Sequence, residues 1–217
     1  IIIILSIAVM SCGVPNVPTA LSSLLERESI RVGTVYGAGT FYNGAEGPQG
    51  FEYELLAGFA DYLGVTLDLY PFYSYEVMLE QLEEGNLDIV ATGDAVTPAL
   101  KRRFAYGPAY QRVEQELVFQ AGATRPRDLA ELDSPIIAVA GSSQAHLLSN
   151  LFKRLSEEED EAVQTQLITT EDSDSEELLQ QVANGDIAYT VADSNRLALQ
   201  RRRYPNLAVA RTLNENM

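Results

Sequence analysis

The 217-residue chain has few of the residues that build disulfides, metal centres or basic surfaces. Its single cysteine, Cys12, has no partner for an internal disulfide, and its single histidine, His146, has no cysteine or histidine at a metal-ligand spacing. Fifteen basic residues stand against thirty-one acidic ones, which leaves a formal charge of −16. Because nucleic acids and anionic membranes bind basic patches, this deficit argues against both surfaces as partners. We expect no metal, no cofactor and no catalytic residues in this chain.

Long hydrophobic runs are also scarce. Residues 1–10, IIIILSIAVM, are shorter than the roughly 20 residues that a membrane-spanning helix needs. The run is typical of a signal-peptide core, and Cys12 follows it like the lipidated cysteine of a lipobox, with Met10 as a departure from the commonest pattern. A plain cleavage site or an incidental thiol is the alternative. We therefore expect a signal-peptide remnant and lipobox over residues 1–12, followed by a tether over residues 13–29.

One helix organises the first half of the chain. The stretch GFEYELLAGFADYLG occupies residues 50–64, and its Leu55, Phe59 and Leu63 recur at four-residue spacing. This pattern predicts that these three side chains form the buried face of the helix. Gly64 stands where helices commonly end in a left-handed residue. Glu52 and Glu54 lie in the first turn, where the helix dipole stabilises negative charge, so we expect their role to be structural.

The rest of the chain alternates short apolar runs with amphipathic segments. In the first half we expect strands at Ile30–Val35, Thr66–Tyr70 and Leu87–Ala91, a loop at Tyr36–Gln49, and helices at Tyr75–Glu84 and Pro98–Arg103. In the second half, a strand at Ile136–Ala140 leads through a polar turn into a helix that ends near Leu155. Strands that alternate with helices predict parallel sheets.

An internal repeat divides the chain into two similar units. Met78–Asp94, MLEQLEEGNLDIVATGD, aligns without a gap with Leu178–Ser194, LLQQVANGDIAYTVADS, and each copy has a helix, a glycine stop, a buried strand and a polar turn. The repeat predicts an α/β protein of two lobes, over residues 30–115 and 116–217, each an open, mostly parallel sheet flanked by helices. Ligands of such sheets bind beyond the carboxyl ends of the strands, so we expect a cleft shared by both lobes.

Three stretches resemble known proteins. Residues 50–64 resemble the start of the first helix in family 3 bacterial solute-binding proteins, the two-lobed periplasmic receptors for amino acids and related ligands. Gly107–Leu132 and Tyr189–Ala210 are similar to the non-catalytic, solute-binding-like domain of the membrane-bound lytic murein transglycosylase F family. The resemblance runs from about Ile30 to Ala210. It implies a two-lobed, periplasmic-binding-protein-like fold of type II.

The resemblance also carries implications for function. In that family the enzyme cleaves peptidoglycan glycan to an anhydro sugar, and the receptor-like domain senses cell-wall peptides. It implies a regulatory domain that binds a cell-wall peptide or amino acid in the periplasm and is anchored to the outer membrane through a lipid on Cys12. Peptidoglycan would be reached through a lysozyme-like catalytic domain. Because the chain stops at Met217, we expect lobe 1 to lack its closing elements and the chain alone to be inactive.

The alternative is a substrate-binding lipoprotein of an importer for amino acids or related polar solutes. A lipidated Cys12 fits either function. Selective binding of a cell-wall stem peptide favours the regulatory domain, whereas tight binding of one free amino acid favours the importer receptor.

The second lobe contributes four residues to the predicted cleft. Ser142, Ser143 and Gln144 join a strand to a helix, where hydroxyl and backbone N–H groups suit a carboxylate or peptide carbonyl. The resemblance makes them part of a ligand-contacting loop, and the alternative is that Ser142 only caps the helix. By the same resemblance, Asp193 matches the receptor aspartate that accepts hydrogen bonds from a ligand amino group. Capping of the following helix is the alternative role, and it is compatible with binding.

The first lobe matches the family's site less well. By resemblance, Thr92 supplies a ligand-contacting hydroxyl group. The aromatic side chain of Phe41 or Tyr42, in the loop after the first strand, can stack on or cover the ligand, with simple packing as the alternative. The receptor arginine that binds the ligand carboxylate corresponds to Leu100 in this chain. Because an apolar side chain does not replace a bidentate guanidinium, ordinary free amino acids are weaker candidates for the ligand. Compensation by Arg102–Arg103 from the next turn is a further possibility.

Overall fold

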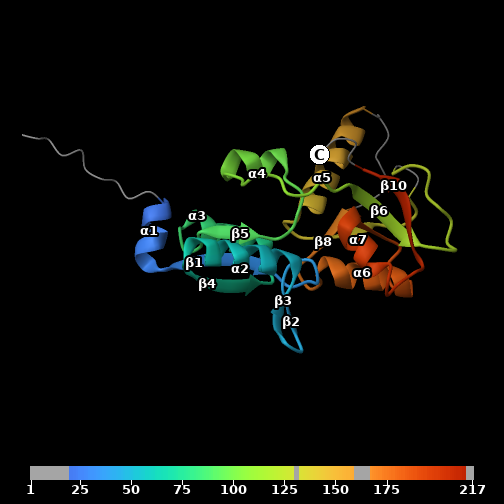
Figure 1. Ribbon diagram of the computed structural model, residues 1–217. Coiled ribbons are helices and arrows are strands. Elements are labelled where there is room, and N and C mark those ends of the chain that lie inside the picture. The colour runs from blue at the N-terminus through green and yellow to red at the C-terminus, as the bar shows by residue number, and fades with distance from the viewer. Residues whose placement is uncertain (1–19, 130–131, 159–166, 214–217) are drawn as a thin grey trace, which may run out of the picture.

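The protein folds into two α/β lobes that lie side by side, as the computed structural model in Figure 1 shows. The structure describes residues 20–129, 132–158 and 167–213. The predicted signal-peptide remnant and the predicted lipidation of Cys12 lie outside these residues. Residues 104–114 contain no helix or strand and connect lobe 1 to lobe 2.

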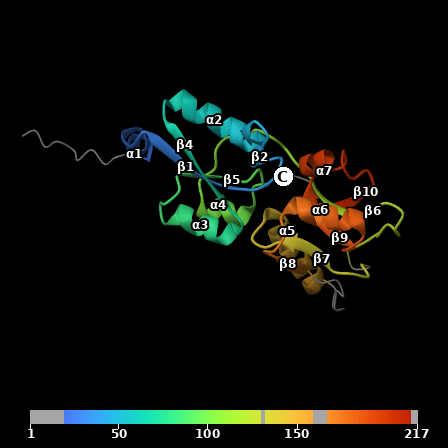
Figure 2. The same cartoon turned by 90° about the horizontal axis from the view of Figure 1, so that it is seen from below.

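Lobe 1 is built on a parallel sheet of three strands in the order β4-β1-β5. Its elements are α1 (Ala20–Arg27), β1 (Ser29–Val35), β2 (Tyr42–Gly44), β3 (Gly47–Gln49), α2 (Phe51–Leu63), β4 (Thr66–Phe72), α3 (Tyr75–Glu83), β5 (Ile89–Ala91) and α4 (Pro98–Arg103). Strand alternation sends Ile30 and Val32 toward α2, whereas Val35 packs with Met78 of α3. Accordingly, Figure 2 shows α2 and α3 on opposite sides of the sheet.

Lobe 2 is built on a five-stranded sheet in the order β10-β6-β9-β7-β8. Its elements are β6 (Gln115–Gln120), β7 (Ile136–Val139), α5 (Ser143–Glu158), β8 (Leu167–Thr170), α6 (Ser175–Asn184), β9 (Tyr189–Asp193), α7 (Ser194–Gln200) and β10 (Leu207–Thr212). The β9-β7-β8 part is parallel, but β6 runs antiparallel to both of its neighbours. The expectation of a mostly parallel sheet therefore describes lobe 1 and half of lobe 2.

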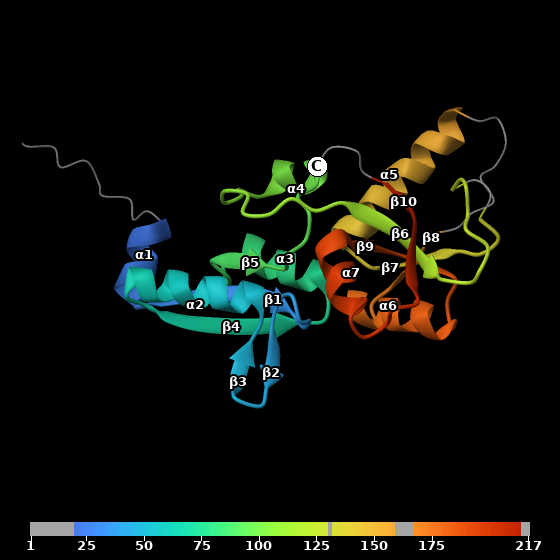
Figure 3. The ribbon, with the colours of Figure 1, turned by 45° about the vertical axis from the view of Figure 1, so that its right-hand side comes forward.

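The internal repeat is present in three dimensions. In lobe 1, β1 pairs in parallel with β4 and β5, and in lobe 2, β7 pairs in parallel with β8 and β9. Figure 3 shows the helices α3 and α6, which precede β5 and β9 in the two lobes. Gly85 and Gly185 follow these helices with φ of 76° and 82°, a conformation that favours glycine. The predicted two-lobed α/β fold is confirmed.

The two lobes share part of their hydrophobic core. Tyr75 of α3 packs in one cluster with Val139 of β7 and Leu178 of α6. Beside this cluster, the N–H of Ala38 donates a hydrogen bond of 2.5 Å to the Glu176 carboxylate, which joins the loop after β1 to α6. Because these contacts connect opposite lobes, the structure represents a closed arrangement of the two.

The buried face of α2 differs from the predicted one. Glu52, Leu56 and Ala60 are buried, whereas Leu55 and Phe59 are 45% and 42% exposed. Both sets recur every four residues. It is Leu56 and Ala60 that pack in one cluster with Ile30 and Val32 of β1. Spacing alone did not separate two neighbouring faces that both carry apolar residues.

The start of the folded body also differs from the prediction. Helix α1 spans Ala20–Arg27, within the range 13–29 that was expected to be a tether. Leu24 of this helix is buried in the lobe 1 core together with Ile30. The folded lobe therefore begins before Ile30, because an amphipathic helix packs its apolar side on the first strand.

Candidate ligand-binding cleft

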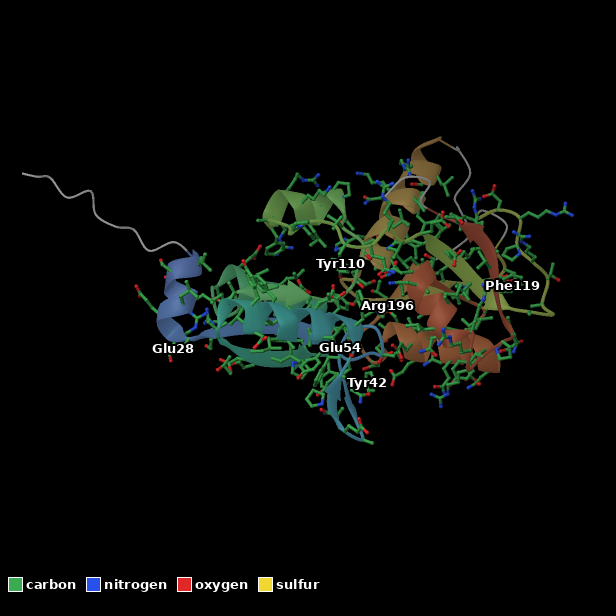
Figure 4. The ribbon with its side chains drawn as sticks, in the orientation of Figure 1. Glu28, Tyr42, Glu54, Tyr110, Phe119 and Arg196 are labelled. Carbon is green, nitrogen blue, oxygen red and sulfur yellow. The ribbon has the colours of Figure 1, made fainter. Side chains whose placement is uncertain are left out.

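The loops that follow the parallel strands meet between the lobes. Thr92–Asp94 follow β5 in lobe 1, while Gly141–Gln144 follow β7 and Asp193 ends β9 in lobe 2. Arg196 of α7 reaches across from lobe 2 and donates a hydrogen bond to the Thr92 carbonyl. Figure 4 shows Arg196 and Tyr110 near the boundary of the two lobes. This junction is where the sequence predicts a cleft.

An ion pair between Arg196 and Asp94 joins the lobes at this junction. Arg196 Nη2 lies 3.1 Å from Asp94 Oδ1, and both side chains are only 9% exposed. The Asp94 carboxylate also receives hydrogen bonds from the Tyr75 hydroxyl and the Ser143 backbone N–H. Removal of one partner from a buried pair leaves an uncompensated charge, so each partner holds the other in place.

The electrostatics of this pair reflect its burial. Burial raises the pKa of Asp94, and the nearby Arg196 charge and the hydrogen bonds from Tyr75 and Ser143 reverse only part of the rise. Burial lowers the pKa of Arg196, but the charges of Asp94 and Asp193 outweigh it, so the pKa lies above its ordinary value. Arg196 therefore remains a cation, and it does not fully offset the surrounding acids.

Asp193 is a second buried acid at the junction. Its side chain is inaccessible to solvent, and Oδ1 accepts a hydrogen bond of 3.2 Å from Gln115 Nε2. Asp193 occupies the N-cap position of α7 but makes no side-chain capping bond, so its carboxylate is directed elsewhere. Burial and the Asp94 charge raise its pKa to about 6, against the opposing effects of Arg196 and Gln144. The carboxylate therefore has unused capacity to bind a donor.

The predicted loop at Ser142–Gln144 divides into two roles. Ser142 Oγ accepts the Ala145 N–H at 3.2 Å and donates to the Val139 carbonyl at 2.7 Å, so it caps α5. Ser143 Oγ accepts a hydrogen bond of 2.8 Å from Gln115, which also binds Asp193. Ser143 therefore lies with the cleft residues, whereas the Ser142 hydroxyl is already used within the fold.

Gln144 completes the lobe 2 side of the junction. Its side chain is 2% exposed, and neither atom of its amide makes a hydrogen bond of regular geometry within the described residues. The same holds for Asp193 Oδ2, although Gln144 lies near enough to this carboxylate to lower its pKa. Because buried polar atoms are normally hydrogen-bonded, these atoms suit a ligand that supplies the missing partners.

Glu52 and Tyr110 add an acid and a phenol from the lobe 1 side. Glu52 opens α2 and is 5% exposed, and its Oε1 accepts a hydrogen bond from the hydroxyl of Tyr110 in the connecting segment. Burial raises the pKa of Glu52, while Tyr110 and Arg196 oppose the rise. Burial and the Glu52 carboxylate raise the pKa of Tyr110 in turn. Glu52 thus does more than complement the helix dipole.

The three predicted lobe 1 residues lie in different places. Thr92 lies at the junction, where its carbonyl binds Arg196. Phe41 is buried within the lobe, and its ring contacts Tyr36 at 5.7 Å between centroids. Tyr42 is 39% exposed and donates to Gln49 within the β2–β3 hairpin, which projects from lobe 1 in Figure 4. The structure therefore brings Thr92, but not Tyr42, to the predicted cleft.

Leu100 lines a cavity beside the junction. The cavity has a volume of about 640 Å³, and Asp94, Tyr106 and Ser143 also line it. Arg103 also lines this cavity, where it pairs with Glu83 of the same lobe at 2.9 Å. Arg196 enters the junction from the opposite lobe.

Sequence reasoning missed Asp94, Arg196 and Gln115. Asp94 lies two residues after the predicted Thr92, in the same polar turn of the repeat, so the turn itself was a signal for it. Arg196 and Gln115 gave no such signal, because their roles depend on how β6 and α7 are placed beside the other strands. In the described parts of the chain, no cluster of three metal-ligating side chains occurs and no helix is long and apolar enough to cross a membrane.

The sequence profile of the bacterial extracellular solute-binding proteins, family 3, matches residues 30–201. The chain belongs to this family. This family 3 protein is 37% identical over 216 residues to membrane-bound lytic murein transglycosylase F from Pseudoalteromonas translucida, a match that covers 100% of the chain and 44% of the relative. A protein of the same name from Aeromonas salmonicida is 37% identical over 214 residues, covering 99% of the chain and 42% of the relative. The chain thus spans less than half the length of these relatives.

Solved structures of amino-acid receptors share the fold of this family 3 protein. Tv2483 bound to L-arginine aligns with a TM-score of 0.75 at 16% identity, covering 90% of this chain and 77% of that one. An amino acid ABC transporter substrate-binding protein from Streptococcus pneumoniae, bound to L-arginine, aligns with a TM-score of 0.71 at 18% identity, covering 86% and 76%. At these identities the likeness establishes the fold, which is that of a type II periplasmic binding protein.

Proposed function

We propose that this chain is a ligand-sensing domain that regulates a peptidoglycan lytic transglycosylase. The 37% identity over 216 residues to proteins named for that activity supports the connection. The ligand binds between the lobes and is a cell-wall peptide or a similar small molecule. The two-lobed fold supports a regulatory role, because a ligand that prefers one arrangement of the lobes shifts the molecule toward it.

The buried pair of Asp193 and Gln144 is the observation that carries this proposal. A carboxylate and an amide stand together at the lobe junction with atoms that make no regular hydrogen bond within the described residues. An ammonium group satisfies the carboxylate, and a neighbouring peptide group satisfies the amide. Amino acids and short peptides carry both groups, and a carboxylate interaction with a cation is about twice as strong as a neutral hydrogen bond.

The cellular location and domain boundaries belong to the same proposal. The family is named for extracellular proteins and the relatives for attachment to a membrane, which supports a place in the bacterial cell envelope. We place the domain in the periplasm, attached to the outer membrane through a lipid on Cys12, with peptidoglycan reached through a catalytic domain of the whole protein. With α1 included, lobe 1 begins at Ala20 instead of residue 30, and lobe 2 begins with β6 at Gln115 instead of residue 116.

Substitution of Asp193 tests the proposal directly. Asp193→Asn keeps the size of the side chain but removes its charge, so we expect at least a tenfold loss of affinity for a muropeptide stem tetrapeptide, measured by titration calorimetry. Asp186→Asn is the matched control, because Asp186 is an exposed acid of the same lobe, and it should bind as the unmodified chain does. Equal affinities for all three proteins, or no binding of any stem peptide, would contradict the proposal.

An importer receptor is the second candidate. The structural neighbour from Streptococcus pneumoniae is named as a substrate-binding protein of an amino acid transporter, and it has the same fold. Tight binding of one free amino acid, with no binding of stem peptides, would favour this candidate. The Asp193→Asn variant then loses amino-acid affinity in the same measurement.

A further inference from the structure

A guanidinium group of the protein itself occupies the acidic part of the cleft. Arg196 extends from α7 of lobe 2 to the Asp94 carboxylate and the Thr92 carbonyl of lobe 1. Both members of the ion pair are 9% exposed, so the contact is enclosed. An ammonium or guanidinium group of a ligand has the same charge and similar donors, and it can form the same contacts.

The charges at this junction leave room for another cation. Asp94 pairs directly with Arg196, and the Arg196 charge also acts on Asp193 and Glu52, so one guanidinium compensates three carboxylates within the described part of the chain. Buried charge is costly unless it is paired, and protonation or a bound cation relieves the cost. A ligand cation therefore gains more here than on a surface where the charges balance.

The lobe 2 wall supplies independent evidence of a binding position. Gln115 donates to both Asp193 and Ser143, which holds the two side chains together at the edge of the cleft. Beside them, Asp193 Oδ2 and both amide atoms of Gln144 are buried without a regular hydrogen bond among the described residues. The two bonds from Gln115 Nε2 hold the wall in place, and the incompletely bonded atoms of Asp193 and Gln144 remain available to a ligand.

We propose that Asp94 is a second acceptor for a ligand ammonium or guanidinium group, beside the Asp193 carboxylate of the proposed function, and that Arg196 occupies Asp94 until the ligand displaces it. The inference rests on the proposed function of the cleft and adds the chemistry of the ligand. Arg196 acts as a tethered competitor. Without a ligand it compensates Asp94 and keeps the lobes joined, and a ligand binds only when its cation outcompetes the tethered one.

A second cavity provides a place for the displaced side chain. This cavity has a volume of about 160 Å³, and Arg196 forms part of its wall. Four acidic residues line the same cavity, at Glu171, Asp172, Asp174 and Glu177. The guanidinium therefore moves from one acidic environment to another, which lowers the free-energy cost of its release.

Methylguanidinium is the probe that tests this inference. It is titrated into the unmodified 217-residue chain and into its Arg196→Ala variant, with binding measured by calorimetry and thermal stability by fluorescence. We expect the Arg196→Ala variant to bind the probe at least tenfold more tightly than the unmodified chain and to gain thermal stability on binding. The reason is that the alanine variant leaves Asp94 without its tethered cation.

Two further variants make the test specific. Adding Asp94→Asn to Arg196→Ala should remove the gained affinity for methylguanidinium. Arg202→Ala is the control, because Arg202 is an exposed arginine of the same lobe, and it should bind the probe as the unmodified chain does. If Arg196→Ala does not fold, Arg196→Gln serves instead, because it also lacks the charge. Three results would overturn the inference. The Arg196 variant does not bind methylguanidinium, it binds the probe no more tightly than the unmodified chain, or its affinity is unchanged when Asp94→Asn is added.

The outcome is separable from that of the proposed function, because methylguanidinium is not the proposed ligand. If stem-peptide binding depends on Asp193 but the Arg196 variant does not bind the probe more tightly, only the proposed displacement of Arg196 is overturned. Probe binding that depends on Asp94, without any stem-peptide binding, supports the cation site and overturns the proposed peptide ligand.

Discussion

At the scale of single residues, the cleft is defined by acids that the fold has removed from water. Asp193 is fully buried and Asp94 is 9% exposed, yet the described residues around them supply one arginine. In proteins, strongly perturbed acids of this kind gather at functional sites as well as in structural ion pairs. The combination with the incompletely bonded Gln144 favours the functional explanation.

The raised pKa of Asp193 predicts a pH dependence of stability. The folded-state pKa is about 6 against an ordinary value of 3.8, so between these values the folded state holds a proton that the unfolded state has lost. Stability contributed by this group is therefore present below about pH 4 and is lost as the pH rises through 6. At about 1.4 kcal/mol for each pKa unit, the loss is about 2 to 3 kcal/mol.

Urea unfolding of the unmodified chain and of Asp193→Asn at pH 4.5 and pH 7 measures this dependence. Asparagine has no proton to lose, so the free energy of unfolding of the variant should rise by about 2 kcal/mol relative to the unmodified chain between the two pH values. Effects of acids that do not interact with Asp193, such as the salt-bridged Asp88, cancel in the comparison. A constant difference between the two proteins would show that Asp193 keeps its ordinary pKa.

At the scale of helices and turns, the approach of the chain to α2 is tightly constrained. Gly50 precedes this helix with φ of 138°, and a Cβ atom there would lie 2.2 Å from the Thr40 carbonyl oxygen. Gly64 ends the helix with φ of 71° and has open space around it. The two ends of α2 therefore need glycine for different reasons: close backbone approach at the start and backbone conformation at the end.

Alanine substitutions at these two glycines separate the two reasons. Gly50→Ala combines a backbone clash with an unfavourable φ, so we expect it to lower the free energy of unfolding by about 3 kcal/mol or more. Gly64→Ala, the matched control, should cost about 1 kcal/mol from conformation alone. Urea unfolding measures both, and equal costs would contradict the geometry of the Thr40–Gly50 contact.

The elements themselves were largely predictable because their signals are local. Thr97 and Pro98 predicted α4, and the structure places Pro98 in the first turn while Thr97 Oγ1 accepts the Leu100 N–H. The repeat predicted the order of α3, Gly85 and β5 from their counterparts in lobe 2. The buried face of α2 was wrong because Leu55 and Leu56 begin two equally apolar rows, and only the packing of the helix on β1 selects one.

The site was predictable only within each lobe. Thr92, Ser143, Gln144 and Asp193 follow predicted strands, and the structure brings them to one junction. The pairing of Arg196 with Asp94 depends on the placement of one lobe against the other, which no local pattern encodes. Tyr42 is separated from the junction because its strand pairs within a hairpin instead of covering the cleft.

At the scale of the whole molecule, contacts between the lobes decide how a ligand acts. Val139 and Leu178 of lobe 2 pack against Tyr75 of lobe 1, and Glu176 and Arg196 bind lobe 1 through polar contacts. Each lobe also has hydrophobic clusters of its own, so the lobes can part without unfolding. A ligand that bridges Asp193 and lobe 1 favours the closed arrangement by its differential affinity.

The distance between the lobes reports directly on ligand binding between them. One spin label is placed on α2 at Tyr62→Cys and one on α5 at Ser149→Cys, both exposed positions, in a chain whose Cys12 is replaced by serine. We expect a muropeptide stem tetrapeptide to shift the distribution of distances between the two labels, and we expect the same peptide to have no effect after Asp193→Asn. An unchanged distribution at saturating peptide would contradict ligand binding between the lobes.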